Sequence, residues 1–106
     1  MTTNVSILRP QGRLDSATSP ALEAEIARTI ADGADRLLLD LGELSYISSA
    51  GLRIVLQAAK QMKSRGGRFA LCALNAPIRE IFDISGFSGF LDISPSQDEA
   101  VARLSQ

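Results

Sequence analysis

Apolar residues along the chain gather in short runs that alternate with segments of helical spacing. Four of these runs predict strands, and they cover residues 5–8, 36–41, 68–74 and 87–93. Residues 13–15 predict a further short extended piece. The run at 36–41 lies between glycines 33 and 42, which is typical of a central strand buried on both faces. We expect a turn over residues 42–47 that leads into a helix.

Four segments have the spacing and the end signals of helices. Ser19 predicts the first helix start as an N-cap, because Pro20 follows at the first helical position. The second helix follows a pair of serines, and its apolar residues recur every three or four positions. Asn75 caps the third helix, and Ser96 opens a capping box for the fourth. The four expected helices therefore cover residues 19–32, 49–65, 75–85 and 96–104.

The order of these elements predicts the fold class. Strands alternate with helices through connections of helix length, which favours an α/β fold with a largely parallel central sheet. We expect about four or five strands and about four helices in one domain over residues 1–106. Pro10 cannot donate to a sheet ladder, so the first strand ends there or lies at a sheet edge.

Composition and charge narrow the classes of function. The chain is 45% hydrophobic and 22% charged, with a net charge of −1 and no basic stripe. This balance gives no electrostatic footprint for nucleic acid or anionic lipid. The chain shows neither a signal peptide nor an apolar run of about 20 residues that would cross a bilayer. We expect a cytoplasmic protein that binds no nucleic acid and does not insert into membranes.

The chain has no histidine and one cysteine. The absence of histidine excludes Ser-His-Asp and Cys-His catalysis, and a typical zinc site would lack its ligands. Carboxylate or lysine chemistry stays open on this ground. Cys72 lies in an apolar run and is expected as a buried thiol. Phe87 and Phe90 are expected in the core rather than as an exposed pair. We expect no enzyme, no cofactor and no metal.

Two serines precede a glycine where the second helix begins, in the stretch Ser48-Ser49-Ala50-Gly51-Leu52. Sites in α/β proteins lie at the carboxyl ends of parallel strands, and a helix N-terminus tolerates negative charge. A phosphoryl group there would add about −1.5 to −2 charges, which suits a reversible binding switch. The alternative from the local motif is a plain serine N-cap.

Residues 40–52 resemble the signature of the STAS domain, in particular that of the bacterial anti-sigma factor antagonists. In that family a strand ends in Asp-Leu, and Asp-Ser-Ser/Thr-Gly-Leu then opens a helix. Residues 12–15 resemble the early Gly-x-Leu-Asp segment of the family. Residues 66–67 match its Gly-Gly pair, and residues 81–87 match its late helix end. The resemblance extends over nearly the whole chain.

The resemblance implies a cycle of phosphorylation. The regulated serine lies two positions before the glycine, which here is Ser49, with Ser48 as the less favoured site. An anti-sigma factor with serine kinase activity phosphorylates it, and a serine phosphatase reverses this. The unphosphorylated form binds the anti-sigma factor and frees the sigma factor for transcription. The implied partner contacts are Leu14, Asp15, Ser48, Ser49, Ala50, Gly51 and Leu52. For Asp15 the alternative is a solvated turn residue that caps a backbone N–H.

The chain departs from the family pattern at three places. Ser48 replaces the acidic residue before the phosphoserine, and Ala50 replaces a Ser or Thr after it. Against the hairpin start that is usual in the family, we expect the N-terminus to be short by about one strand.

A second hypothesis keeps the fold and changes the role. The protein would then be a constitutive STAS subunit of a lipid-transport or stress-signalling complex, in which the serine is only structural. A third is a hydrolase or nucleotide-handling protein that uses one of the serines, against which the missing histidine and the missing phosphate-loop and Gly-x-Ser-x-Gly motifs argue. The oligomeric state stays open.

Overall fold

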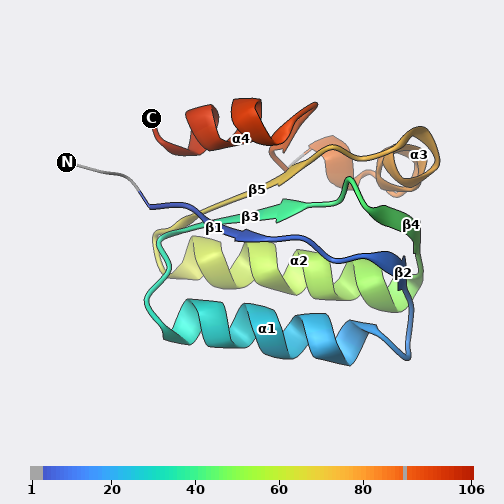
Figure 1. Cartoon of the computed structure of the whole chain (residues 1–106), viewed down its shortest axis with the longest axis horizontal. Coiled ribbons are helices and arrows are strands. Elements are labelled where there is room, and N and C mark those ends of the chain that lie inside the picture. Colours follow the sequence, from blue (N-terminus) through green and yellow to red (C-terminus); the bar gives the residue numbers. More distant parts are fainter. Residues whose placement is uncertain (1–3, 90) are drawn as a thin grey trace.

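The hydrophobic runs build two parallel sheets in the computed structural model, which describes residues 4–89 and 91–106. The main sheet has four strands in the order β1-β3-β5-β6. Its strands are β1 (Ser6–Leu8), β3 (Arg36–Asp40), β5 (Arg68–Cys72) and β6 (Ile93–Ser94), and each neighbouring pair is parallel. The second sheet pairs β2 (Gly12–Leu14) with β4 (Leu44–Ile47), also in parallel. Figure 1 shows this pair beyond the ends of β1 and β3.

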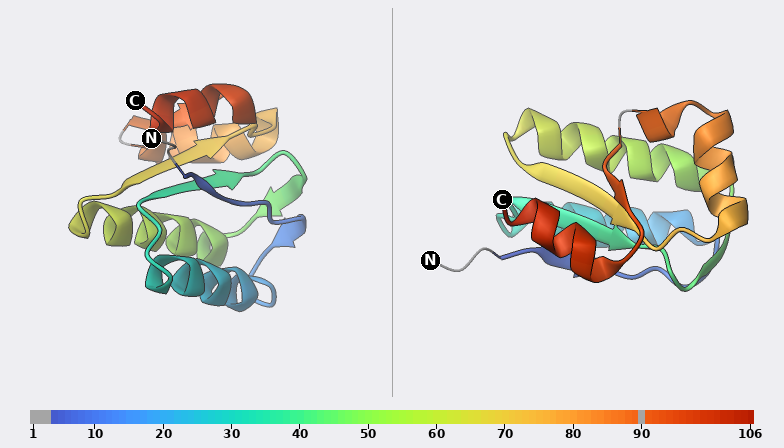
Figure 2. Two further views of the ribbon diagram at one scale, coloured as in Figure 1. Left: turned by 60° about the vertical axis from the view of Figure 1, so that its left-hand side comes forward. Right: turned by 90° about the horizontal axis from the view of Figure 1, so that it is seen from above.

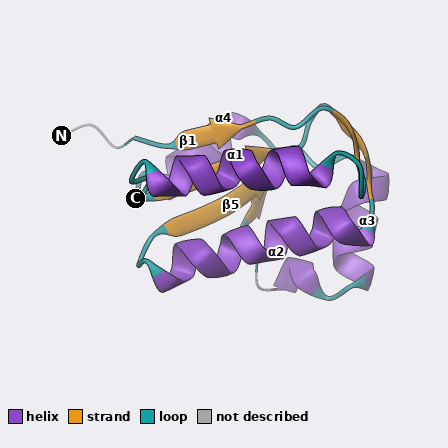
Figure 3. Cartoon of the chain, turned by 90° about the horizontal axis from the view of Figure 1, so that it is seen from below, coloured by secondary structure: helices purple, strands orange, loops and turns teal. Residues whose placement is uncertain are grey.

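Helices cover both faces of the main sheet. The helices α1 (Ser19–Ala31) and α2 (Ser49–Ser64) lie side by side on one face (Figures 1 and 3). The helix α4 (Gln97–Leu104) packs on the opposite face (Figure 2). The helix α3 (Ala76–Ile84) and the 3₁₀ turn η1 (Phe87–Gly89) lie at the end of the molecule where β4 meets α2. The α/β class and the number of main strands and α-helices agree with the sequence prediction.

The core consists of two apolar clusters, one on each face of the sheet. Successive residues of a strand point to opposite faces. Leu37 and Leu39 therefore face α1 and α2, whereas Leu38 faces α4, and none of these three side chains is exposed. The central strand β3 is thus buried on both faces, as its apolar run predicts.

The thiol of Cys72 belongs to the smaller cluster under α4 and is fully buried. Burial raises its pKa to about 11, with the nearby Asp40 carboxylate acting in the same direction. At neutral pH the thiol is therefore protonated and is a poor nucleophile. The expectation of a buried core cysteine is confirmed.

Two strand predictions were wrong in detail. Residues 44–47, expected as part of a turn, form β4, because their pairing with β2 supplies an extended partner that the local pattern does not show. Of residues 87–93, the first three form η1 and β6 begins only at Ile93. Phe87 is half-buried and packs against the larger cluster, as expected, whereas the expectation for Phe90 lies outside the described residues.

The prediction that Ser19 caps the first helix was also wrong, since the N-cap is Thr18. The chain enters α1 through a turn that Thr18 closes. Its hydroxyl donates to the carbonyl oxygen of Arg13 at 2.7 Å and accepts from the N–H of Asp15 at 2.9 Å. Ser19 is buried, with only 3% of its surface exposed. Its Oγ has no hydrogen-bond partner among the described residues.

Replacing Ser19 by alanine is expected to leave stability unchanged or to raise it by about 1 kcal/mol, because a buried hydroxyl without a partner costs desolvation. In a domain of this size that is a rise of several degrees in Tm, which thermal unfolding followed by circular dichroism would detect.

Ser96→Ala is the matched control for this measurement. Ser96 does cap its helix, since its Oγ accepts from the N–H of Glu99 at 3.2 Å. Losing that bond should cost about 1 kcal/mol. If Ser19→Ala destabilises the protein as much as Ser96→Ala does, the Ser19 hydroxyl has a partner after all.

Candidate functional site

The turn between β4 and α2 gives its two serines different roles. Ser48 is the N-cap of α2 and is half-buried. Its Oγ accepts from the N–H of Gly51 at 3.3 Å, and its own N–H donates to the carbonyl oxygen of Leu14 at 2.9 Å. The hydroxyl of Ser48 is therefore engaged in holding the helix start.

Ser49 is the first residue of α2 and is exposed. Its hydroxyl makes no hydrogen bond with the part of the chain that the structure describes. An exposed hydroxyl in the first turn of a helix is accessible to a modifying enzyme, and the helix dipole favours negative charge there. Of the two serines, Ser49 is therefore the one whose hydroxyl is exposed and not engaged within the described residues.

Gly51 allows α2 to begin close against the smaller sheet. A Cβ atom on Gly51 would lie 2.8 Å from Ile47 Cγ1 and 2.9 Å from Leu14 Cγ, closer than real Cβ contacts come. Both Gly51 and Leu14 are buried, so they support the turn from beneath. Ala50 and Leu52 are half-buried and lie nearer the surface.

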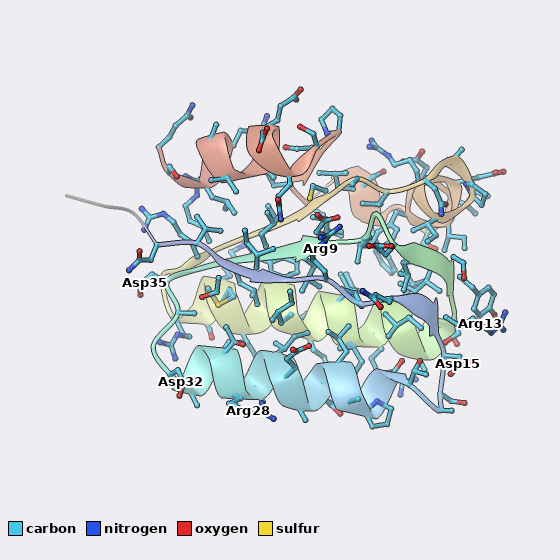
Figure 4. All side chains as sticks on the ribbon, viewed as in Figure 1. Arg9, Arg13, Asp15, Arg28, Asp32 and Asp35 are labelled. Carbon is cyan, nitrogen blue, oxygen red and sulfur yellow. The ribbon has the colours of Figure 1, made fainter. Side chains whose placement is uncertain are left out.

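Asp15 follows β2, at the same end of the molecule as β4 (Figure 4). The backbone N–H groups of Ala17 and Thr18 donate to its Oδ1 at 3.0 and 3.1 Å. The Arg13 guanidinium lies 3.6 Å from its Oδ2 and stacks over the ring of Tyr46, 4.2 Å from the centroid. The carboxylate of Asp15 thus closes the turn into α1, and its side chain remains partly exposed beside this site.

The hydrogen bond from the Thr18 N–H holds the pKa of the Asp15 carboxyl below its ordinary value. The Ala17 N–H and the charge of Arg13 act in the same direction, against a partial opposing effect of desolvation. The folded pKa lies below the unfolded one, so the stability that Asp15 contributes is present above about pH 4. That contribution is lost as the pH falls through the folded pKa.

We therefore expect Asp15→Ala to lower Tm at pH 7, and the difference from wild type to shrink as the pH falls from 4 toward 2. Thermal unfolding at a series of pH values would measure it. Glu25→Ala is the control, because Glu25 is an exposed acid of α1. A Tm difference for Asp15→Ala that stays constant across this range would show that the carboxylate charge is not what stabilises the turn.

A second carboxylate fixes the chain on its way to the site. Asp40, at the end of β3, is buried, and its Oδ1 accepts from the N–H of Gly42 at 2.9 Å. Its Oδ2 lies 3.4 Å from Nε of Arg9. These contacts turn the chain from the main sheet into β4 and so position the serine pair.

A hollow of about 500 Å³ opens directly beside Ser49. It lies between α2 and the end of α3, and it has an apolar floor with two cations at its border. Its lining residues are Ser49, Leu52, Arg53, Leu56, Gln57, Lys60, Ser85 and Phe87. The sequence prediction missed Arg53 and Lys60, although their spacing of four and eleven residues from Ser49 would have put all three on one side of a helix.

The structure brings most of the predicted site residues together, since Ser48 to Leu52 are contiguous and Leu14 packs beneath Gly51. Within residues 4–89 and 91–106 there is no group of three or more acidic, cysteine or histidine side chains that could hold a metal ion. Among the same residues, no helix has the length and apolar character needed to cross a membrane.

Comparison with known proteins assigns the family. The STAS domain model matches residues 1–100 of the chain. BtrV of Bordetella bronchiseptica, whose name places it among the anti-sigma factor antagonists, is 47% identical over 92 residues, which are 87% of this chain and 79% of that protein. The anti-sigma-B factor antagonist of Bacillus subtilis is 31% identical over 85% of this chain and 82% of its own. The chain belongs to the STAS domain family.

Comparison with solved structures agrees with this family assignment. The crystal structure of an anti-sigma factor antagonist from Mycobacterium paratuberculosis superposes with a TM-score of 0.88 at 26% identity, covering 96% of this chain and 86% of that one. The predicted family resemblance is confirmed. The names of these relatives describe regulatory binding proteins, in agreement with the expectation that the chain is not an enzyme.

Proposed function

We propose that this protein is an anti-sigma factor antagonist whose binding is switched by phosphorylation of Ser49. In the unphosphorylated form it binds an anti-sigma factor, which then releases its sigma factor. The anti-sigma factor is also the serine kinase that modifies Ser49, and a serine phosphatase restores the binding form. The observation that carries the proposal is the exposed, unbonded hydroxyl of Ser49 beside an engaged Ser48.

The position of Ser49 supports a switch that leaves the fold intact. A phosphate in the first turn of α2 meets the positive end of the helix dipole, so the domain tolerates it. A partner that covers the same turn would have to desolvate the added charge, which is costly unless the partner supplies a cation. Phosphorylation would therefore weaken binding without unfolding the protein.

The accessible part of the predicted surface supports a partner footprint around this turn. Ser49 is exposed, and Asp15, Ser48, Ala50 and Leu52 are half-buried. In this proposal these residues contact the partner. Leu14 and Gly51 contribute from beneath, because they hold the start of α2 in place.

Phosphosite mapping by mass spectrometry tests the proposal. The purified chain is incubated with ATP and an extract of its source organism, with Ser49→Ala and Ser48→Ala as parallel samples. The expected result is phosphate on Ser49 in the wild type and in Ser48→Ala, and none in Ser49→Ala.

Two other outcomes would either move the modified site or contradict the switch. Phosphate on Ser48 would keep the mechanism and move its site. No phosphate on either serine, where a related antagonist is modified under the same conditions, would contradict the switch. It would favour a constitutive STAS subunit of a lipid-transport or stress-signalling complex.

A further inference from the structure

Arg53 stands one helical turn after Ser49 on α2. Residues four apart on a helix have their Cβ atoms about 6 Å from each other, so their side chains meet. Both residues line the same hollow, which confirms that the two side chains share one side of the helix. Arg53 is exposed and makes no ion pair or side-chain hydrogen bond with any described residue. Its guanidinium is therefore available to a new anion.

Few carboxylates near Arg53 could compete with a phosphate for its guanidinium. The hollow that it shares with Ser49 has no carboxylate in its lining. On its other side Arg53 borders a smaller hollow of about 240 Å³ between α1 and α2, where Glu23 is the acidic residue of the lining. The structure places no ion pair between Glu23 and Arg53. Lys60 is the other cation at the hollow beside Ser49.

We infer that Arg53 is the residue that holds a phosphate on Ser49, pairing with it across one turn of α2. The inference rests on the proposed function, because it takes Ser49 as the modified residue. A guanidinium presents parallel N–H donors that match two phosphate oxygens, and such charge-assisted pairs are stronger than neutral hydrogen bonds.

The pairing changes the surface in two ways at once. The phosphate adds negative charge at the start of α2, and Arg53 ceases to be a free cation at the border of the hollow. A partner that contacts the unphosphorylated hydroxyl and the free guanidinium therefore meets neither in the modified protein. Arg53 acts as a positioning residue, which fixes the phosphate over the turn.

A direct test uses the whole 106-residue chain with phosphoserine installed at position 49 during synthesis, so that no kinase is needed. Phosphorus NMR over pH 4 to 8 gives the second pKa of the phosphate, and it is compared between wild type and Arg53→Gln. A neighbouring guanidinium favours the dianion, so the wild-type value is expected to be lower by about half a unit. Arg53→Lys should retain part of the shift, since it keeps the charge and loses the fork.

Lys60→Gln is the matched control. It removes one cation from the same helix and the same hollow, but it lies seven residues further on, about 10 Å along the axis beyond Arg53. Lys60→Gln should move the phosphate pKa by less than about 0.1 unit, because salt screens a charge at that distance. Equal shifts in Arg53→Gln and Lys60→Gln, or no shift in Arg53→Gln, would overturn the inference.

This test separates the inference from the proposed function. If cell extracts leave Ser49 unmodified, the switch fails, and the installed phosphoserine still reports whether Arg53 pairs with it. If Ser49 is phosphorylated and Arg53→Gln does not change the phosphate pKa, the switch stands and the role of Arg53 fails. Circular dichroism checks that each variant is folded, which is the expected result because the replaced side chains are exposed.

Discussion

Replacing Ser49 by aspartate is expected to weaken binding to the anti-sigma factor by about tenfold or more, which is about 1.4 kcal/mol. The aspartate places a permanent negative charge in the first turn of α2, where the proposed partner footprint would desolvate it. The fold should survive, because the side chain of Ser49 is exposed and acidic groups are tolerated at a helix start. Isothermal titration calorimetry with the purified anti-sigma factor would measure the change in Kd.

Ser49→Asn is the control for shape, since it has the size of aspartate without its charge. It should bind within a few-fold of wild type, and Ser49→Ala should do the same. If Ser49→Asp binds as tightly as Ser49→Asn, negative charge at this position does not release the partner, and the proposed switch has no electrostatic basis.

Replacing Gly51 by alanine is expected to lower the free energy of unfolding by about 1 to 2 kcal/mol. The added Cβ would lie within 3.0 Å of atoms of Ile47 and Leu14, and overpacking of this kind typically costs about 1 to 3 kcal/mol. The higher helix propensity of alanine offsets part of that cost. Urea unfolding at equilibrium, followed by circular dichroism, would give the difference.

Gly89→Ala is the matched control, because a Cβ atom at Gly89 meets nothing within 4 Å. It should leave the unfolding midpoint close to that of wild type. Equal stability of Gly51→Ala and wild type would mean that the close approach of α2 to the smaller sheet is not needed, which would contradict the role given to Leu14 and Gly51 beneath the site.

Those parts of the fold that local patterns determine were predictable from the sequence. The strands β3 and β5 come from apolar runs that are buried on both faces, and the helices α3 and α4 carry side-chain caps at Asn75 and Ser96. In each case the residues that define the element also make its stabilising contacts.

The misses came from interactions between segments far apart in the sequence or from geometry within a turn. The strand β4 exists because β2 pairs with it, and its buried residues stand at its two ends, Leu44 and Ile47, rather than alternating. Thr18, and not Ser19, stands at the N-cap position of α1, and its hydroxyl bonds back to the carbonyl oxygen of Arg13 instead of capping the helix. Neither the pairing of β2 with β4 nor the hydrogen bond of Thr18 can be derived from the secondary-structure propensities of the neighbouring residues.

The candidate site also divides into features that the local sequence predicts and features that only the folded chain shows. The sequence placed Ser48 and Ser49 at the start of a helix, where either serine is a good cap, and only the family resemblance favoured Ser49 as the regulated one. The separation follows from the bond between Ser48 and Gly51 and from the exposure of Ser49. The hollow beside Ser49 needs η1 packed near α2, so its cation Arg53 was recognised only in the folded chain.

The most direct measurement of the central claim is the release of a sigma factor from its complex with the anti-sigma factor. The complex is mixed with the unphosphorylated chain or with the chain that carries phosphoserine at position 49, and free sigma factor is quantified by size-exclusion chromatography. We predict that the unphosphorylated chain releases the sigma factor and that the phosphorylated chain does not. Equal release by both forms, or release by neither, would contradict this prediction.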